Sequence, residues 1–255
     1  MGAHHHEHGP LPLSERTAET QRVAIVGAIV NLLLSGVKLV AGTLANSAAL
    51  IADGIHSLSD LLSDVLVWFA SHHAGHAPDE EHPYGHGRFE TAATLGLGIL
   101  LALVALGIVW DAVAGAFHGE ESIPGILAIY AALFSILANE ALYWYTLVVA
   151  RRIKSDMLRA NAWHHRTDAI SSVVVLIGVA GAMLGWPYLD SLAAVLVGVM
   201  VAKIGWDLGW EAMQELVDAA LDEETVERAH EVIMSVDGVS SVHMLRTRRH
   251  GHEAA

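Results

Sequence analysis

Residues 91–110 read TAATLGLGILLALVALGIVW and contain no charged side chain. A helix of about twenty residues is about 30 Å long at 1.5 Å per residue, which matches the hydrocarbon core of a bilayer. Residues 169–189 form a second uncharged run of similar length. The whole chain is 53% hydrophobic, and its mean hydropathy is +0.44. The sequence therefore predicts an all-α membrane protein rather than a soluble globule.

Four further apolar stretches bring the expected number of transmembrane helices to six. One is interrupted only by Lys38, whose long stem can carry the ammonium to the membrane surface. Another is interrupted only by Glu140. A third carries several ionisable side chains among Leu, Ile, Val, Trp and Phe, so one face of this helix is expected to be polar. The four stretches are residues 23–45, 47–70, 122–150 and 190–206.

Lys and Arg carry the topology signal in short loops, and here they are unevenly distributed. Residues 151–159, between the fourth and fifth spans, hold four of them, whereas the loops at 43–47, 118–121 and 185–188 hold none. Both termini are therefore expected to be cytoplasmic. Residues 1–22 lack the apolar core of a signal peptide, so the first span is expected to direct insertion, into a bacterial inner membrane.

The chain divides into three expected regions. Residues 1–20 form a polar, His-bearing tail, residues 21–212 hold the six helices, and residues 213–255 form a cytoplasmic segment. In this segment Asp222 is expected to cap a helix, and residues 239–245 are expected to form one strand. A lone helix and strand cannot close a sheet, so the segment resembles the beginning of a larger α/β fold.

Charge and cysteine content limit the classes of partner. The formal net charge is −14, which is unsuited to nucleic-acid binding because that function requires a basic face. The chain has no Cys, so thiolate ligands are excluded, and copper(I) is not the expected cargo. An acidic protein of this kind suits cationic partners.

Two His-Asp pairs share one spacing, His56-x-x-x-Asp60 and His164-x-x-x-Asp168. Four residues apart, both side chains of a pair lie on one helix face, and two such helices together supply four ligands. Imidazole and carboxylate in a four-fold set suit a divalent ion, zinc above all. For a single His-Asp pair, a role as a helix cap or as an ordinary hydrogen-bonded polar residue is as good an explanation as metal binding. An ionisable residue in a bilayer costs about 2.5–3.5 kcal/mol, however, so four of them indicate a function.

Three motifs carry a resemblance to the cation diffusion facilitator family, whose members export divalent metals in exchange for protons. Residues 47–60, SAALIADGIHSLSD, resemble its second helix, and residues 82–88, HPYGHGR, resemble the loop that follows. His164 with Asp168 resembles its fifth helix. The motifs occur in the expected order within nearly the whole chain.

The resemblance implies a transport site in the membrane and a preference of that site for zinc. Cadmium, cobalt, nickel, iron(II) and manganese remain open as cargo, because ligand identity alone does not choose among them. Some members of the family have a second metal position after the second helix, for which the alternative is a solvated polar loop. The implied ligands are His56, Asp60, His164 and Asp168 in the membrane and Asp79, His82 and His86 in the loop.

The resemblance also implies a homodimer, paired through a ferredoxin-like cytoplasmic domain. Only the first helix and strand of that domain are expected before residue 255. His243 lies in this segment, but no metal is assigned to it because further ligands are missing.

Because protons and metal compete for imidazole and carboxylate, the expected activity is antiport across the membrane. Two other functions remain open. One is a membrane metal sensor or scaffold without transport. The other is a membrane metalloenzyme, which is disfavoured because no His-Glu-x-x-His motif supplies a general base. The chain is therefore not expected to be an enzyme.

Several other polar residues allow two interpretations each. Asp64 lines the ion path at the cytoplasmic entrance, or else it is a carboxylate that faces water. Asp53 lines the path on the outer side, or else it forms a hydrogen bond to a neighbouring helix. Asn139 and Glu140 either bind a passing ion or form structural hydrogen bonds between helices, and the second interpretation is slightly favoured. His165 is expected to be a neighbour of the site rather than a ligand. The His-rich tracts, at residues 4–8 and 72–76, capture cations loosely or are simply solvated.

Overall fold

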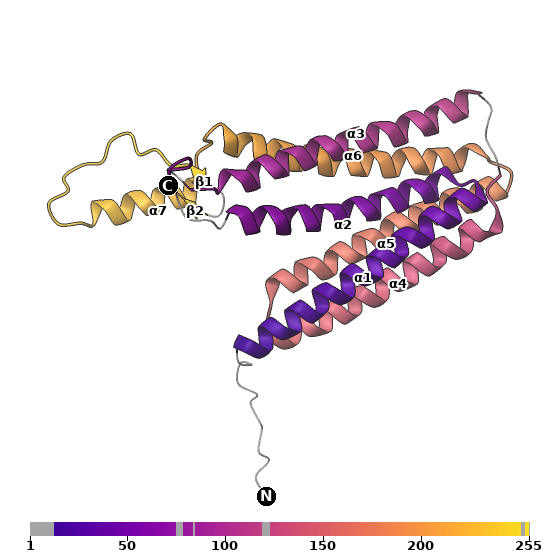
Figure 1. The fold of residues 1–255 in the computed structure, drawn as a ribbon, viewed down its shortest axis with the longest axis horizontal. Coiled ribbons are helices and arrows are strands. Elements are labelled where there is room, and N and C mark those ends of the chain that lie inside the picture. Colours follow the sequence, from indigo (N-terminus) through magenta and orange to yellow (C-terminus); the bar gives the residue numbers. More distant parts are fainter. Residues whose placement is uncertain (1–12, 75–78, 84, 119–122, 251–252, 255) are drawn as a thin grey trace, which may run out of the picture. The chain divides into compact units, whose positions relative to one another are not determined.

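The computed structural model describes residues 13–74, 79–83, 85–118, 123–250 and 253–254. These residues form long helices followed by a short helix and two very short strands (Figure 1). The elements are α1 (Leu13–Ala45), α2 (Ala48–Ala74), α3 (Arg88–His118), α4 (Ile126–Ile153), α5 (Asp156–Met183), α6 (Tyr188–Leu216), α7 (Glu223–Met234), β1 (Arg249–His250) and β2 (Glu253–Ala254).

The prediction of an all-α membrane protein is confirmed. Among the described helices, α1, α3, α4, α5 and α6 are long and apolar enough to cross a membrane. Helix α2 falls outside this set because its ionisable side chains lower its hydropathy. The helices also extend beyond the predicted spans: α1 begins at Leu13 rather than at residue 23, and α6 continues to Leu216. Hydropathy marks where a helix meets hydrocarbon, whereas backbone hydrogen bonding continues past that boundary.

One predicted span contains a turn. The uncharged run at 169–189 is divided, because α5 ends at Met183 and α6 begins at Tyr188. Gly185 adopts a φ of 103°, a backbone conformation that favours glycine. The division falls at the loop expected at 185–188, so the first part of the run belongs to the fifth expected span and its end to the sixth.

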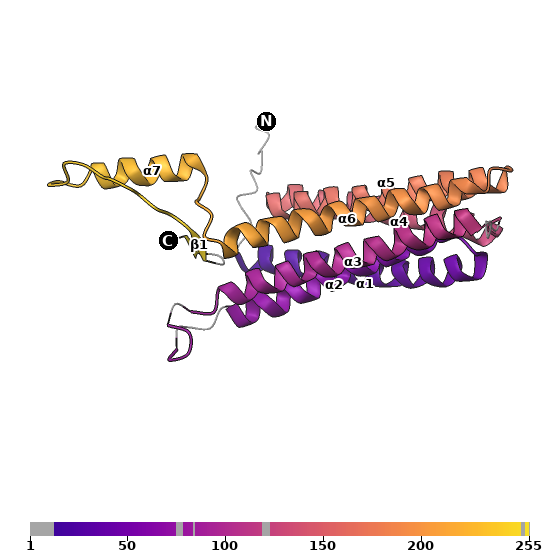
Figure 2. The same cartoon turned by 90° about the horizontal axis from the view of Figure 1, so that it is seen from above.

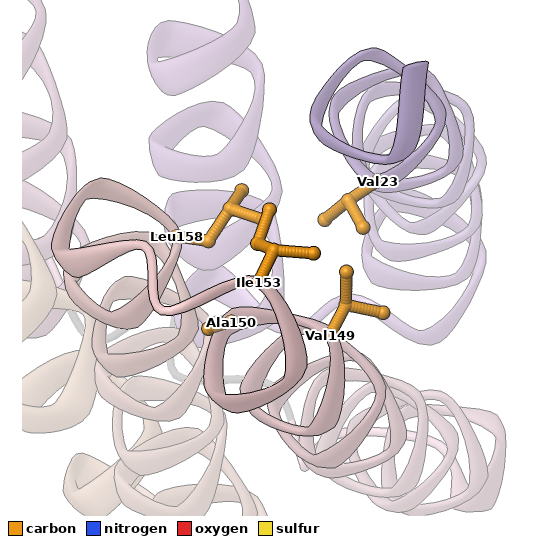
Figure 3. Close-up of a cluster of buried hydrophobic side chains, with 5 residues drawn as sticks. All are labelled: Val23, Val149, Ala150, Ile153 and Leu158. Carbon is orange, nitrogen blue, oxygen red and sulfur yellow. The ribbon is translucent and has the colours of Figure 1, made fainter. Parts of the chain in front are cut away.

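The described chain forms two compact units, Met1–Leu61 with Gly107–Val199 and Leu62–Leu106 with Met200–Ala255. In the first unit α4 packs along α5 and against α1 (Figure 1). The α4–α5 connection is tight: Lys154 takes a φ of 52°, and the Ser155 hydroxyl accepts a bond from the backbone N–H of Leu158 at 3.2 Å. Figure 3 shows the apolar cluster beside this turn, formed by Val23, Val149, Ala150, Ile153 and Leu158.

The interior of the first unit is built mainly from small residues. Ala128, Ala132 and Ala162 are fully buried, whereas Leu44 is 71% exposed and Leu137 is 63% exposed. Small residues allow close helix approach, and large apolar side chains that face outward suit a lipid solvent. The distribution agrees with the membrane assignment.

The start of α2 is held by a carboxylate from another helix of the first unit. Asp190, in the first turn of α6, accepts hydrogen bonds from the Ser47 hydroxyl at 2.7 Å and from the backbone N–H of Ala48 at 2.7 Å. The backbone N–H of Gly125, just before α4, donates to the carbonyl of Ala45 at 2.8 Å. These bonds satisfy helix-end groups that have no partner within their own helix.

In the second unit α3 and α6 pack closely and run side by side (Figure 2). A Cβ added at Gly98 would lie 2.7 Å from the backbone N of Gly209 and 2.8 Å from the carbonyl oxygen of Gly205. Leu97, Leu101, Ala105 and Val201 form the apolar cluster around this contact.

Substitution of Gly98 by alanine is expected to destabilise the protein by about 1–3 kcal/mol, because the new methyl group meets backbone that cannot rotate away. Gly96 is the matched control, since a Cβ there meets nothing within 4 Å. Gly96→Ala should be neutral or stabilise by about 0.5–1 kcal/mol through helix propensity. Unfolding of the two variants in detergent, followed by circular dichroism, compares them. Equal stabilities would contradict the close approach.

The cytoplasmic segment agrees with the prediction only in part. Helix α7 forms, and Asp222 caps it by accepting a bond from the backbone N–H of Thr225 at 2.9 Å. The Thr225 hydroxyl also donates to Asp222, at 2.8 Å. The bond from the hydroxyl is the largest cause, and the bond from the backbone N–H the next, that hold the pKa of the Asp222 carboxyl below its ordinary value. The strand predicted at 239–245 is wrong, because these residues form no strand. A strand needs a paired neighbour, and the described pairing joins only β1 to β2, each two residues long.

Candidate metal sites

Helices α2 and α5 bring three predicted ligands together in the first unit. His56 Nε2 lies 3.8 Å from Asp60 Oδ2 and 4.0 Å from Asp168 Oδ1. One ligand atom from each residue lies within 4.8 Å of the others. The side chains are 4%, 17% and 7% exposed, respectively, so the group lies inside the helix bundle.

His164, the fourth predicted ligand, stands beside this group rather than in it. Its Nε2 lies 3.8 Å from Asp168 Oδ2, and its side chain is 43% exposed. The structure thus brings three of the four predicted residues together, and the fourth, His164, approaches this group at Asp168.

The buried oxygens of this group lack hydrogen-bond donors. Among the described residues, Asp60 Oδ2 and Asp168 Oδ1 are buried without a hydrogen-bond partner. Buried polar atoms are nearly always satisfied, and an unsatisfied carboxylate oxygen carries a high desolvation cost. A cation between these oxygens and His56 would supply the missing partner. The donor set of nitrogen and carboxylate oxygen fits a divalent transition metal.

Lys38 lies inside the bundle, and the prediction that it reaches the membrane surface is wrong. Lys38 and Asp53 are both 0% exposed, and the Lys38 Nζ lies 2.7 Å from Asp53 Oδ2. The Nζ also donates to the Ser57 hydroxyl at 3.0 Å. Because the buried Asp53 carboxylate pairs with the Lys38 ammonium inside the bundle, the Lys38 side chain does not need to extend to water. A hydropathy profile of a single helix contains no information about that partner.

Asp53 also bonds to α5, which agrees with the second interpretation offered for it. Its Oδ1 accepts a bond from the Ser171 hydroxyl at 2.8 Å, and its Oδ2 accepts one from the Ser172 hydroxyl at 2.9 Å. The Ser172 hydroxyl in turn lies 3.0 Å from the Ser135 hydroxyl of α4. Asp53 therefore joins helices rather than standing free in a path.

Asn139 and Glu140 make contacts within α4 and with α5, although Asn139 Oδ1 is buried without a hydrogen-bond partner among the described residues. The Asn139 amide lies 3.5 Å from the Ser135 hydroxyl, and Glu140 accepts a bond from Trp144 Nε1 at 3.1 Å. Glu140 also lies 4.0 Å from Arg166 of α5. His165 is buried, and its ring lies close to Gly27. Both of its ring nitrogens are buried without a hydrogen-bond partner among the described residues, and the group around His56 does not include it.

The loop residues predicted as a second site also lie together, within the second unit. Asp79 Oδ1 lies 3.5 Å from His82 Nδ1, and Asp79 Oδ2 lies 3.5 Å from His86 Nε2. The two imidazole rings have centroids 4.4 Å apart, and Phe89 stacks on the ring of His86 at 5.7 Å. The three side chains form a group that can hold a metal ion.

Backbone hydrogen bonds orient the Asp79 carboxylate. The N–H groups of His82 and Glu81 donate to Asp79 Oδ1 at 2.7 and 3.0 Å. The bond from His82 is the main cause that holds the pKa of the Asp79 carboxyl below its ordinary value of 3.8, against the opposing effect of desolvation. The loop thus fixes one ionised carboxylate beside two imidazoles. A cavity of about 510 Å³ borders His82 and His86.

Other predicted metal-binding features lie outside the described side chains or are exposed. Residues 4–8 and residue 76 lie outside the described residues, and the side chains of residues 72 and 73 are not described. Asp64 and His243 are exposed, and neither belongs to a described group of ligands.

The sequence matches two family profiles. Their descriptions are "Cation efflux transmembrane domain", over residues 24–217, and "Cation efflux protein, cytoplasmic domain", over residues 221–255. The first match covers most of the chain, and its limits include every helix that bears a predicted transport ligand. The chain belongs to the cation efflux family, as the resemblance predicted. This family consists of transporters, which agrees with the prediction that the chain is not an enzyme.

Three relatives illustrate the similarity. Metal tolerance protein 2 of Oryza sativa subsp. japonica is 40% identical over 91% of this chain and 66% of its own length. Metal tolerance protein C1 of Arabidopsis thaliana is 39% identical over 91% of this chain and 53% of its own. Manganese efflux system protein MneP of Bacillus subtilis (strain 168) is 33% identical over 94% and 82%. The chain thus spans less than two thirds of either plant relative.

Proposed function

We propose that the protein exports a divalent metal cation, Zn²⁺ foremost, from the cytoplasm in exchange for protons. The cation binds His56, Asp60, His164 and Asp168. The observation that carries the proposal is the pair of buried carboxylate oxygens, on Asp60 and Asp168, that face His56 without hydrogen-bond donors. His164 would complete a four-fold set by turning from its partly exposed position toward Asp168, which its Nε2 already approaches at 3.8 Å.

Proton exchange follows from the chemistry of these ligands. Metal binding requires neutral imidazole and ionised carboxylate, so protons and metal compete for the same atoms. A site open to a neutral cytoplasm binds the cation. The same site open to a more acidic exterior takes up protons, which lowers its affinity and releases the cation.

The proposal requires α2 to be a sixth span, with both termini in the cytoplasm. The polar residues of α2 that lower its hydropathy include those that point into the bundle, among them Asp53 and His56, both buried. A transmembrane helix can carry polar side chains on a face that neighbouring helices cover. The cations of residues 151–159, between α4 and α5, support a cytoplasmic position for that loop.

In this proposal residues 21–212 form the transmembrane domain, and residues 213–255 belong to a cytoplasmic domain of the ferredoxin-like type. We propose a homodimer in a bacterial inner membrane. The match of residues 221–255 to the family's cytoplasmic domain supports the assignment of this segment.

Manganese is a second candidate for the cargo, because the Bacillus relative is named a manganese efflux protein. The ligand set favours zinc: imidazole suits Zn²⁺, whereas Mn²⁺ prefers sites made of carboxylate, carbonyl and water oxygens.

The test is cation flux into proteoliposomes that contain the purified chain. With an acidic interior, Zn²⁺ should accumulate, and collapse of the pH gradient with a protonophore should stop accumulation. Mn²⁺ measured in parallel decides between the two cargoes. Zn²⁺ flux that persists without a gradient would contradict proton exchange. Binding without flux of any cation would favour a metal sensor.

Asp79, His82 and His86 are proposed as a second metal site. In a chain with Asp60→Ala and Asp168→Ala, which removes the first site, His86→Ala should weaken Zn²⁺ binding by about 10–100-fold. His243→Ala, at an exposed His outside the group, is the control. Because the pKa of the Asp79 carboxyl is lowered, this carboxylate stays ionised as the pH falls into mild acid, so loss of binding there is not caused by its protonation. Calorimetry at several pH values measures this, and binding that is unchanged in His86→Ala would exclude the site.

A further inference from the structure

A polar network lies next to the cation site, and the proposed transport mechanism does not use it. Asp53 precedes His56 by three residues on α2, and Ser171 follows Asp168 by three residues on α5. The Ser171 hydroxyl lies 2.8 Å from both Asp53 Oδ1 and the carbonyl oxygen of Asp168. The network is therefore one helical turn from ligands on both helices.

The central carboxylate of this network is fully occupied. Asp53 accepts bonds from two serine hydroxyls of α5 and pairs with the ammonium of Lys38, which comes from α1. All four of these side chains are buried. Lys38 additionally donates to Ser57, the residue that follows His56. Three helices thus meet at Asp53, and two of them bear the proposed ligands.

Without Lys38, Asp53 would be a third buried carboxylate close to the site. It would carry an uncompensated negative charge on the same helix as His56 and Asp60. Its oxygens are hard donors, which favour Mn²⁺ or Mg²⁺ over Zn²⁺ when they are added to a site that contains imidazole.

We infer that Lys38 is a specificity-determining residue of the cation site. It neutralises Asp53 and retains this carboxylate as the bond between α2 and α5, so that Asp53 does not act as a further oxygen ligand. This inference rests on the proposed function, in that it assigns the cation site to the His56 group.

The test compares three full-length proteins by calorimetry, each with His82→Ala and His86→Ala so that the loop does not contribute. They are the otherwise unchanged chain, Lys38→Met, and the double variant Lys38→Met with Asp53→Asn. Methionine keeps the length of the lysine stem without its charge. Asparagine keeps an oxygen that accepts a serine bond. The quantity measured is the ratio of the Mn²⁺ to the Zn²⁺ dissociation constant.

Lys38→Met should lower this ratio by about tenfold, because Asp53 becomes available to the cation. The double variant should return the ratio to that of the unchanged chain. General disruption of the fold would weaken both cations alike and leave the ratio unchanged. An unchanged ratio in Lys38→Met overturns the inference.

The double variant decides the matter if Lys38→Met does not fold. The inference requires that the double variant, in which both residues of the ion pair are neutral, folds and has the same ratio of dissociation constants as the unchanged chain. A double variant that is unfolded, or folded with a shifted ratio, overturns it. Failure of the proposed function is seen separately, as absence of Zn²⁺ and Mn²⁺ binding or of proton-coupled flux in the protein with Lys38 and Asp53 intact.

Discussion

Replacement of Asp60 and Asp168 together by alanine is expected to lower Zn²⁺ flux by more than about 100-fold, because loss of one outer-shell partner alone typically costs about 10–100-fold in metal affinity. These two residues supply the buried oxygens that have no hydrogen-bond donor. Of the four proposed ligands, their removal leaves the imidazoles of His56 and His164, and the second of these is partly exposed. Flux into proteoliposomes under a pH gradient measures the loss.

The same variant should not be less stable, and this separates loss of the site from loss of the fold. Each of the two carboxylates has one buried oxygen without a hydrogen-bond partner among the described residues, so its removal relieves a desolvation cost. Asp207→Ala is the matched control, since Asp207 is an exposed carboxylate of α6 paired with Lys203. It should transport at the normal rate. A double variant that is folded and transports within about threefold of the unchanged protein would move the site elsewhere.

The helices were predictable because their signal is local. An uncharged run such as 91–110 needs no knowledge of the rest of the chain to be assigned as a span. The strand predicted at 239–245 failed for the opposite reason: a strand depends on a partner, and the pattern of one segment does not contain it. Helix α2 lies between these cases. Its apolar residues suggest a span, but the role of its polar face is explained only by the contacts that this face makes with α1 and α5.

The candidate site could be predicted as a set of residues but not as a geometry. The spacing of four residues predicted that each His lies on the same helix face as its Asp. In the structure the His Nε2 lies 3.8 Å from the Asp Oδ2 in both pairs. Spacing did not predict that His164 would be 43% exposed while His56 is buried, because this depends on which helices cover each face. The partner of Lys38 was missed in the same way. A signal was present, since Lys38 and Asp53 have opposite charges in adjacent predicted spans.

Truncation of Lys38 to alanine is expected to destabilise the protein by about 3–5 kcal/mol, the typical effect of removing one partner of a buried ion pair. The destabilisation arises mainly from Asp53, which stays buried with two serine bonds but without a compensating charge. Unfolding of the purified chain in mixed detergent micelles, followed by circular dichroism, measures the difference.

Lys203→Ala provides the comparison, because it breaks another Lys–Asp pair whose side chains are 74% and 57% exposed. An exposed pair of this kind contributes about 0.2–1 kcal/mol, since water screens both charges. If the two lysine variants were equally stable, loss of the buried ammonium would cost no more than loss of an exposed one, which would contradict a buried Lys38–Asp53 pair. A large difference instead locates the cost in the interior, one helical turn from the proposed cation site, where four helices share the hydrogen bonds of Asp53, Ser172 and Ser135.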